Sequence, residues 1–86
     1  MKKHDIIDTV ESGKKIKDIC KEKNVKAIEI VEELGIAEAT YVYRWYKGKS
    51  FPSLYMLFKL SRFLETPIDD FIVVNKVKTL EKDEER

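Results

Sequence analysis

The spacing of apolar residues along the 86-residue chain predicts short helices separated by tight turns. In residues 26–34, Ile30, Val31 and Leu34 recur at the i, i+1, i+4 spacing of one helical face, and glutamates take the other side. Gly35 then ends this helix, because glycine reaches the left-handed conformation that closes a helix at little cost. The pattern favours an all-α protein.

A second helix is predicted at residues 38–47, and its two faces differ in chemistry. At 100° per residue, Val42 and Trp45 point to one side. The opposite side carries hydroxyl groups and cations, contributed by Thr40, Tyr43, Arg44 and Lys47. Such a helix, anchored by an apolar face and offering donors outward, suits the major groove of DNA. Trp45 could stack on a base, but its side of the helix favours a place in the core.

A further helix is predicted before this pair, at residues 8–23. Its inward side comprises Val10, Ile16, Ile19 and Cys20. Gly13 interrupts this pattern and could mark the start of the compact domain. Asp8 or Thr9 could cap the longer version of the helix, because both side chains can accept a hydrogen bond from a first-turn amide.

Two more helices are predicted after residue 47. Ser53 is a suitable N-cap for a helix at residues 54–64, since its hydroxyl can accept from a free amide of the first turn. The apolar residues give this helix a broad core-facing side, made up of Leu54, Leu57, Phe58, Leu60, Ser61 and Leu64. Thr66 and Pro67 predict the start of a fifth helix, because the missing N–H of proline costs nothing at the first helical position.

These elements define one domain with an extension at each end. We expect residues 1–12 to be a partly ordered N-terminal extension, with Ile6 and Ile7 against the body. Residues 13–74 form the predicted helical domain, with no clear strand, although residues 71–74 could be briefly extended. Residues 75–86 are strongly polar, so we expect a charged C-terminal tail that is mobile or forms a short exposed helix.

The segment GIAEATYVYRWYKGKSFPS resembles the recognition helix and following loop of the lambda-repressor-like (Cro/XRE-type) helix-turn-helix regulators. Their pattern has a glycine, a buried aliphatic residue, a large apolar residue three positions later, a Gly-Lys pair and a Pro-Ser pair. Here these are Gly35, Val42, Trp45, Gly48–Lys49 and Pro52–Ser53. The resemblance covers about residues 13–73. It implies a compact five-helix bundle that binds duplex DNA, with the helix-turn-helix at its second and third helices.

Arg44 is the best candidate for reading a base, because a guanidinium can bond guanine O6 and N7 together. The resemblance also places a base contact at this position. Thr40 is the second candidate, reading a base edge or a thymine methyl. Ala39 matches another base-reading position of the family and offers apolar contact only. For Tyr43 two interpretations stay open: its ring packs on a sugar or a thymine methyl, or it is simply exposed.

Phosphate contacts are expected at the ends of these helices. Lys47 and Lys49 match backbone-contacting positions of the family, and such contacts fix register without reading sequence. The resemblance and the helix dipole also place a phosphate near the amide of Ala27. The net charge is only +1, but residues 39–62 contain five cations and no acid, whereas acids cluster at residues 29–38. This asymmetry predicts one positive face.

Other function classes find little support in the sequence. His4 is the one histidine and Cys20 the one cysteine, and no glycine-rich phosphate loop is present. We therefore expect no metal, cofactor or catalytic site, and Cys20 to fill the core. No apolar run approaches the ~18 residues of a membrane span. The N-terminus lacks the apolar core of a signal peptide, so a cytoplasmic protein is expected.

The expected function is that of a sequence-specific transcriptional regulator that binds double-stranded DNA as a homodimer. We expect the dimer to form around residues 71–74 and the tail that follows. The alternative is an antitoxin or protein-interaction module that keeps the fold and binds a protein partner. This alternative stays open because Lys26, Ala27 and Ala39 stand where many members of the family carry polar side chains.

Overall fold

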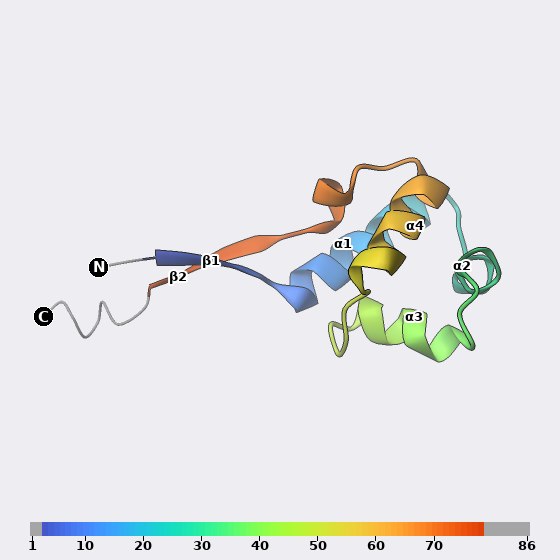
Figure 1. The fold of residues 1–86 in the computed structure, drawn as a ribbon, viewed down its shortest axis with the longest axis horizontal. Helices are drawn as coiled ribbons and strands as arrows, with labels where there is room; N and C mark the ends of the chain where they lie inside the picture. The colour runs from blue at the N-terminus through green and yellow to red at the C-terminus, as the bar shows by residue number, and fades with distance from the viewer. Residues whose placement is uncertain (1–2, 79–86) are drawn as a thin grey trace, which may run out of the picture.

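The computed structural model describes residues 3–78 of the chain, with side chains described for residues 6–75. The helical body contains α1 (Thr9–Glu22), α2 (Ala27–Leu34), α3 (Ala39–Tyr46) and α4 (Leu54–Leu64). A 3₁₀ turn at Ile68–Phe71 follows α4. Two strands, β1 (Lys3–Ile7) and β2 (Val74–Lys78), form a narrow sheet that extends away from the body (Figure 1). The four helices agree within one or two residues with those that the apolar spacing predicts.

The prediction of a fifth helix, and with it of an all-α bundle, needs correction. Residues 68–71 form a single 3₁₀ turn, and the chain then extends into β2. Pro67 does stand at the N-cap of this turn. The residues that follow, Ile72, Val73 and Val74, are β-branched and favour extended backbone over helix. The described chain is therefore mostly helical with a small sheet.

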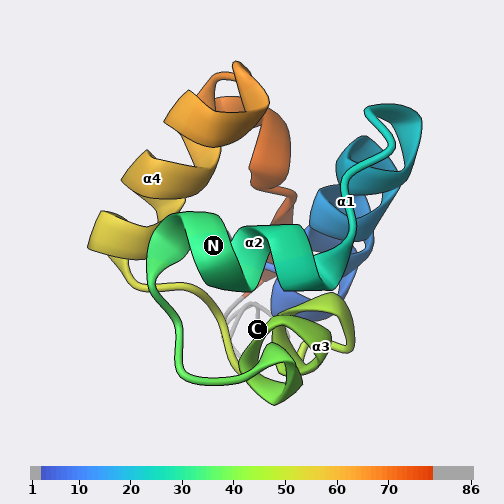
Figure 2. The same ribbon diagram turned by 90° about the vertical axis from the view of Figure 1, so that its right-hand side faces the viewer.

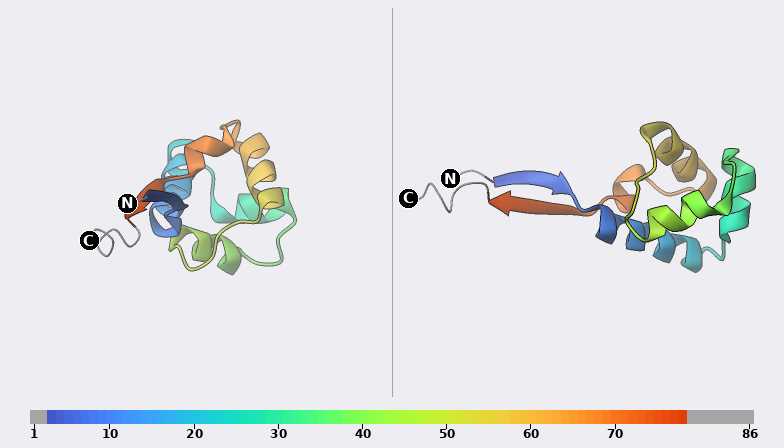
Figure 3. Two further views of the ribbon diagram at one scale, coloured as in Figure 1. Left: turned by 60° about the vertical axis from the view of Figure 1, so that its left-hand side comes forward. Right: turned by 90° about the horizontal axis from the view of Figure 1, so that it is seen from below.

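β1 and β2 pair antiparallel, with Ile7 opposite Val74, and so join the two ends of the described chain (Figure 3). The sequence predicts neither strand. Ile6 and Ile7, expected against the body, lie in β1 with about half of each side chain exposed. Residues 75–78, expected in a tail, belong to β2, and residues 79–86 lie outside the described part of the chain.

Asp8 and Ser12 fasten the sheet to α1. Asp8 caps the helix, since one carboxylate oxygen accepts from the N–H of Glu11 at 2.9 Å. Its second carboxylate oxygen accepts from the side-chain amide of Asn75. The buried hydroxyl of Ser12 accepts from the N–H of Val73 at 2.8 Å, and the N–H of Asp8 donates to the Val73 carbonyl oxygen at 2.8 Å. The root of the sheet is therefore tied to the first turn of α1.

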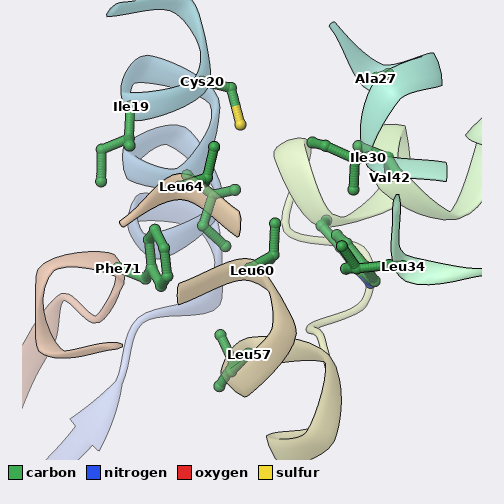
Figure 4. Close-up of a cluster of buried hydrophobic side chains, with 12 residues drawn as sticks. Ile19, Cys20, Ala27, Ile30, Leu34, Val42, Leu57, Leu60, Leu64 and Phe71 are labelled. Carbon is green, nitrogen blue, oxygen red and sulfur yellow. The ribbon is translucent and has the colours of Figure 1, made fainter. Parts of the chain in front are cut away.

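The core lies where the four helices and the 3₁₀ turn converge (Figure 4). Its buried members are Ile16, Ile19, Cys20, Ala27, Ile30, Leu34, Val42, Trp45, Leu57, Leu60, Leu64 and Phe71. The predicted inward faces of α2 and α3 are confirmed, with Val31 partly buried against the core, as is the placing of Cys20 in the core. None of the helices within residues 3–78 has the length and apolar character that crossing a membrane requires.

Three side chains that the sequence assigns to the core are exposed: Val10, Leu54 and Phe58. In α4 the buried leucines are spaced i, i+3, i+7, which is a narrower stripe than the run of apolar residues in this helix. Leu54 and Phe58 therefore lie outside the stripe and face solvent. Val10 lies at the amino end of α1, where it contacts the main chain of Gly48 rather than the core.

Candidate nucleic-acid interface

α2 and α3 form a helix-turn-helix on one face of the body. Viewed along the long axis, α2 crosses between α1 and α4, and α3 lies along its lower side (Figure 2). Gly35 closes α2 in the left-handed conformation, with φ of 71°, as its position in the sequence predicts. The short turn that follows leads directly into α3.

One side of α3 is fixed in the core and the other faces solvent. Val42 and Trp45 are buried, so the expected core position of Trp45 is confirmed. The residues on the opposite side are all exposed, and we call them the α3 stripe: Thr40, Tyr43, Arg44 and Lys47. The stripe contains a hydroxyl, a phenol and two cations, and no acid. Its composition allows hydrogen bonding to base edges and to phosphates.

A close contact with α1 sets the position of the carboxyl end of α3. Gly13 lies within α1, not at its start, and is buried. A Cβ atom on Gly13 would lie 2.1 Å from the carbonyl oxygen of Trp45 and 3.0 Å from that of Tyr46. Any other residue would collide with this main chain. Glycine at position 13 therefore allows α1 and α3 to approach closely, which fixes the α3 stripe relative to the core.

The turn after α3 presents the two lysines that the sequence assigns to phosphates. Gly48 takes the left-handed conformation, with φ of 75°, and a Cβ there would lie 2.6 Å from the Cα of Val10. The N–H of Lys49 donates to the carbonyl oxygen of Arg44 at 2.9 Å, which closes the helix. Lys47 and Lys49 are both exposed on this turn, at the carboxyl end of the α3 stripe.

The amino end of α3 begins at Glu38, whose side chain makes no capping hydrogen bond. The first-turn amides of α3 therefore have no side-chain acceptor from Glu38, although the N–H of Tyr41 donates to the Glu38 carbonyl oxygen at 3.3 Å. Thr40 is exposed beside them, whereas Ala39 is half-buried. Ala39 can therefore offer only part of its methyl group to a ligand.

The start of α2 is less suited to a phosphate. The N–H of Lys26 donates to Glu29 Oε1 at 2.7 Å, and Ala27 is buried. The carboxylate of Glu29 thus takes the place at the helix N-terminus where the dipole favours an anion. This carboxylate repels a phosphate approaching the amide of Ala27.

A depression of about 460 Å³ lies between α1, the start of α2, and α3. Lys17, Lys21 and Lys26 line it, together with the rings of Tyr43 and Tyr46, and none of its lining residues is acidic. Nothing in the sequence distinguishes Lys17 and Lys21 from the other lysines of α1. Their i, i+4 spacing places them on one face of α1, but only the packing of α1 shows that this face adjoins α3.

The floor of this depression is uncharged. Burial raises the pKa of the Cys20 thiol above its ordinary value, which outweighs a lowering by the adjacent Tyr46. Burial likewise raises the pKa of Tyr46, with a further contribution from Cys20. Both groups therefore stay neutral at physiological pH, and the charge at this site comes from the lysines around its rim. Within the described residues no three potential metal ligands cluster together.

No family model matches the chain, and no curated protein matches its sequence. Solved structures do share its fold. The restriction-modification controller protein C.AhdI from Aeromonas hydrophila superposes with a TM-score of 0.67 at 19% identity, covering 73% of this chain and 94% of that one. The chain has the lambda-repressor-like helix-turn-helix fold.

Two further structures with this fold are DNA-binding domains. The DNA-binding domain of BldD matches with a TM-score of 0.64 at 17% identity, over 76% of this chain and 93% of that one. The DNA-binding domain of BldD from S. venezulae gives the same TM-score and identity, over 76% and 96% of the two chains. The lambda-repressor-like fold therefore accounts for about three quarters of the chain.

Proposed function

We propose that the protein is a transcriptional regulator that binds double-stranded DNA sequence-specifically, with α3 in the major groove. The observation that carries this proposal is the α3 stripe. The inner side of α3 is held by the core and by the close contact at Gly13. Its outer side, which is the stripe, offers hydrogen-bond donors and cations without an acid. The similarity in fold to two DNA-binding domains supports the same role.

The proposed contacts divide by position along α3. Arg44, at the middle of the stripe, and Thr40, near the start of α3, read base edges. Tyr43 packs on a sugar or a thymine methyl, and Ala39 adds a minor apolar contact. Lys47 and Lys49 hold phosphates at the carboxyl end.

Lys17 and Lys21 add positive charge beside the depression. We place the phosphate backbone of the second DNA strand next to them. Because of Glu29, we assign the amide of Ala27 at most a weak phosphate contact.

One recognition helix covers few base pairs, so useful specificity calls for two half-sites about one helical turn apart. We therefore propose that the protein acts as a homodimer on DNA, in the cytoplasm. No metal, cofactor or catalytic step is part of this function.

A protein-interaction role, including that of an antitoxin, is the second candidate, and α4 provides the observation in its favour. Leu54, Tyr55 and Phe58 are 76%, 61% and 49% exposed on the outer side of this helix. Arg62 and Lys59 lie over the rings of Phe58 and Tyr55, at 5.5 and 4.9 Å from the ring centres. Exposed apolar residues gathered on one helix are typical of a surface that binds another protein.

Selection from a random-sequence duplex pool at low salt tests the two functions against each other. The DNA-binding proposal expects enrichment of a defined motif by the native protein. A Thr40→Ala/Arg44→Ala variant should lose this enrichment, whereas the control Tyr55→Ala on α4 should keep it. If the native protein binds no duplex even at low salt, the proposal is wrong and the α4 surface becomes the leading site.

A further inference from the structure

The two-stranded sheet is incomplete as it stands. Within residues 3–78 no third strand pairs with β1 or β2. A two-stranded sheet is only marginally stable in water, and each free edge presents unpaired N–H and C=O groups to any strand that can reach it. The sheet also extends from the body, so the helices do not cover it (Figures 1 and 3).

The β1 edge combines these free main-chain groups with exposed apolar side chains. Ile6 is 49% exposed and Ile7 is 48% exposed, and both are β-branched residues that suit a sheet. Val74, opposite Ile7 on β2, is half-exposed as well. Neither proline nor glycine occurs in either strand to block pairing. The hydrogen bonds of Asp8 and Ser12 hold the root of this edge in place.

We infer that β1 pairs antiparallel with β1 of a second copy of this chain, across a two-fold axis, to give a four-stranded sheet. A second copy fits because the edge is identical in both molecules, and a two-fold antiparallel contact uses the β1 edge of both copies at once, with β2 of each copy outermost. The inference rests on the proposed function in one respect: binding to two half-sites calls for two copies.

The length of the strands determines the strength and the shape of this dimer. A strand of five residues spans about 17 Å, so the helical bodies would lie at opposite ends of the shared sheet. A contact made by two five-residue strands should bury less than the roughly 1,200 Å² of a typical stable interface. The dimer should therefore be weak in free solution and become fully formed when two half-sites bring the copies together.

Sedimentation equilibrium without DNA tests the interface directly. The native protein should associate at high micromolar concentration, and Ile6→Glu should weaken the association at least tenfold. The control is Ile28→Glu, the same change at an isoleucine of α2 that is 54% exposed, and it should dimerise like the native protein. Circular dichroism shows whether the helices of each variant remain folded. Equal association of folded Ile6→Glu and native protein would overturn the inference.

Binding to selected duplexes with one or two half-sites provides the second readout. Folded Ile6→Glu should keep the native affinity for one half-site and lose the cooperative gain on two. If it loses affinity for the single half-site and keeps the gain, β1 contacts DNA rather than a second copy, and the inference is wrong. If the native protein binds no DNA, the proposed function fails, while sedimentation still decides whether β1 forms the dimer.

Discussion

Replacing Gly13 by alanine has two opposing effects on stability: a gain in helix propensity and a collision of the new Cβ atom with α3. In an ordinary helix interior this change stabilises by about 1 kcal/mol, because alanine has the higher helix propensity. In α1 the added Cβ would lie 2.1 Å from the carbonyl oxygen of Trp45 and 3.0 Å from that of Tyr46. Both oxygens belong to the main chain of α3 and its end, so neither can rotate out of the way.

The steric collision should outweigh the gain in helix propensity. The two helices must separate by roughly 1 Å to restore an ordinary contact distance, which also loosens the packing on both sides. Overpacking that forces a backbone shift costs about 1–3 kcal/mol, and a clash with main chain belongs at the upper end. After the gain in propensity, the net loss should be about 1–2 kcal/mol. For a domain of this size that lowers Tm by roughly 5–15 °C.

Urea unfolding followed by circular dichroism measures the difference. Lys15 lies two residues along α1 and is exposed, so the pair Lys15→Gly and Lys15→Ala gives the propensity gain in this helix without a collision. We expect Lys15→Ala to exceed Lys15→Gly in stability, and Gly13→Ala to fall below the native protein. A Gly13→Ala variant as stable as the native protein, or more stable, would show that the Cβ of alanine is accommodated without a collision.

Two further variants test the core and the floor of the depression. Trp45→Ala should cost ~3–5 kcal/mol, because a large buried side chain is removed, and a thermal melt shifted by only a degree or two would contradict this. The raised pKa values of Cys20 and Tyr46 mean that the folded protein holds both protons more tightly than the unfolded chain. The stability they contribute is therefore complete below the ordinary thiol pKa and declines as the pH rises above it. The double variant Cys20→Ala/Tyr46→Phe should lose less stability from pH 8 to pH 10.5 than the native protein; an equal loss would show that other groups dominate.

The helices could be predicted because their signals are local. Gly35, the capping residue Asp8 and the apolar spacing of α2 and α3 each act within one or two turns of chain. The two faces of α3 followed from spacing alone. Gly13 shows the limit of such signals: it stands out in the sequence as an interruption, but its reason is the main chain of α3, more than thirty residues away.

The sheet could not be predicted for the same reason. β1 and β2 come from opposite ends of the described chain, and neither strand is stable without the other. Each alone reads as a short polar segment with a few apolar residues. The exposure of Leu54 and Phe58 also depends on packing, because the sequence of α4 offers a wider apolar face than its neighbours cover.

The candidate site was only partly accessible from the sequence. Thr40, Tyr43, Arg44 and Lys47 share an exposed face, as predicted, but their contacts with DNA remain proposals. Lys17 and Lys21 join the site only through the packing of α1.

The proposed function assigns a base contact to Arg44 and a phosphate contact to Lys49, and these two kinds of contact respond differently to DNA sequence and to salt. Binding of both alanine variants to a selected duplex and to a scrambled one, across a salt series, tests the central claim most directly. Arg44→Ala should lose ~1–3 kcal/mol on the selected duplex and relax preference at one base pair. Lys49→Ala should weaken both duplexes alike and lower the salt slope by about one per subunit. The claim is contradicted if Arg44→Ala weakens both duplexes equally, or if neither variant changes binding.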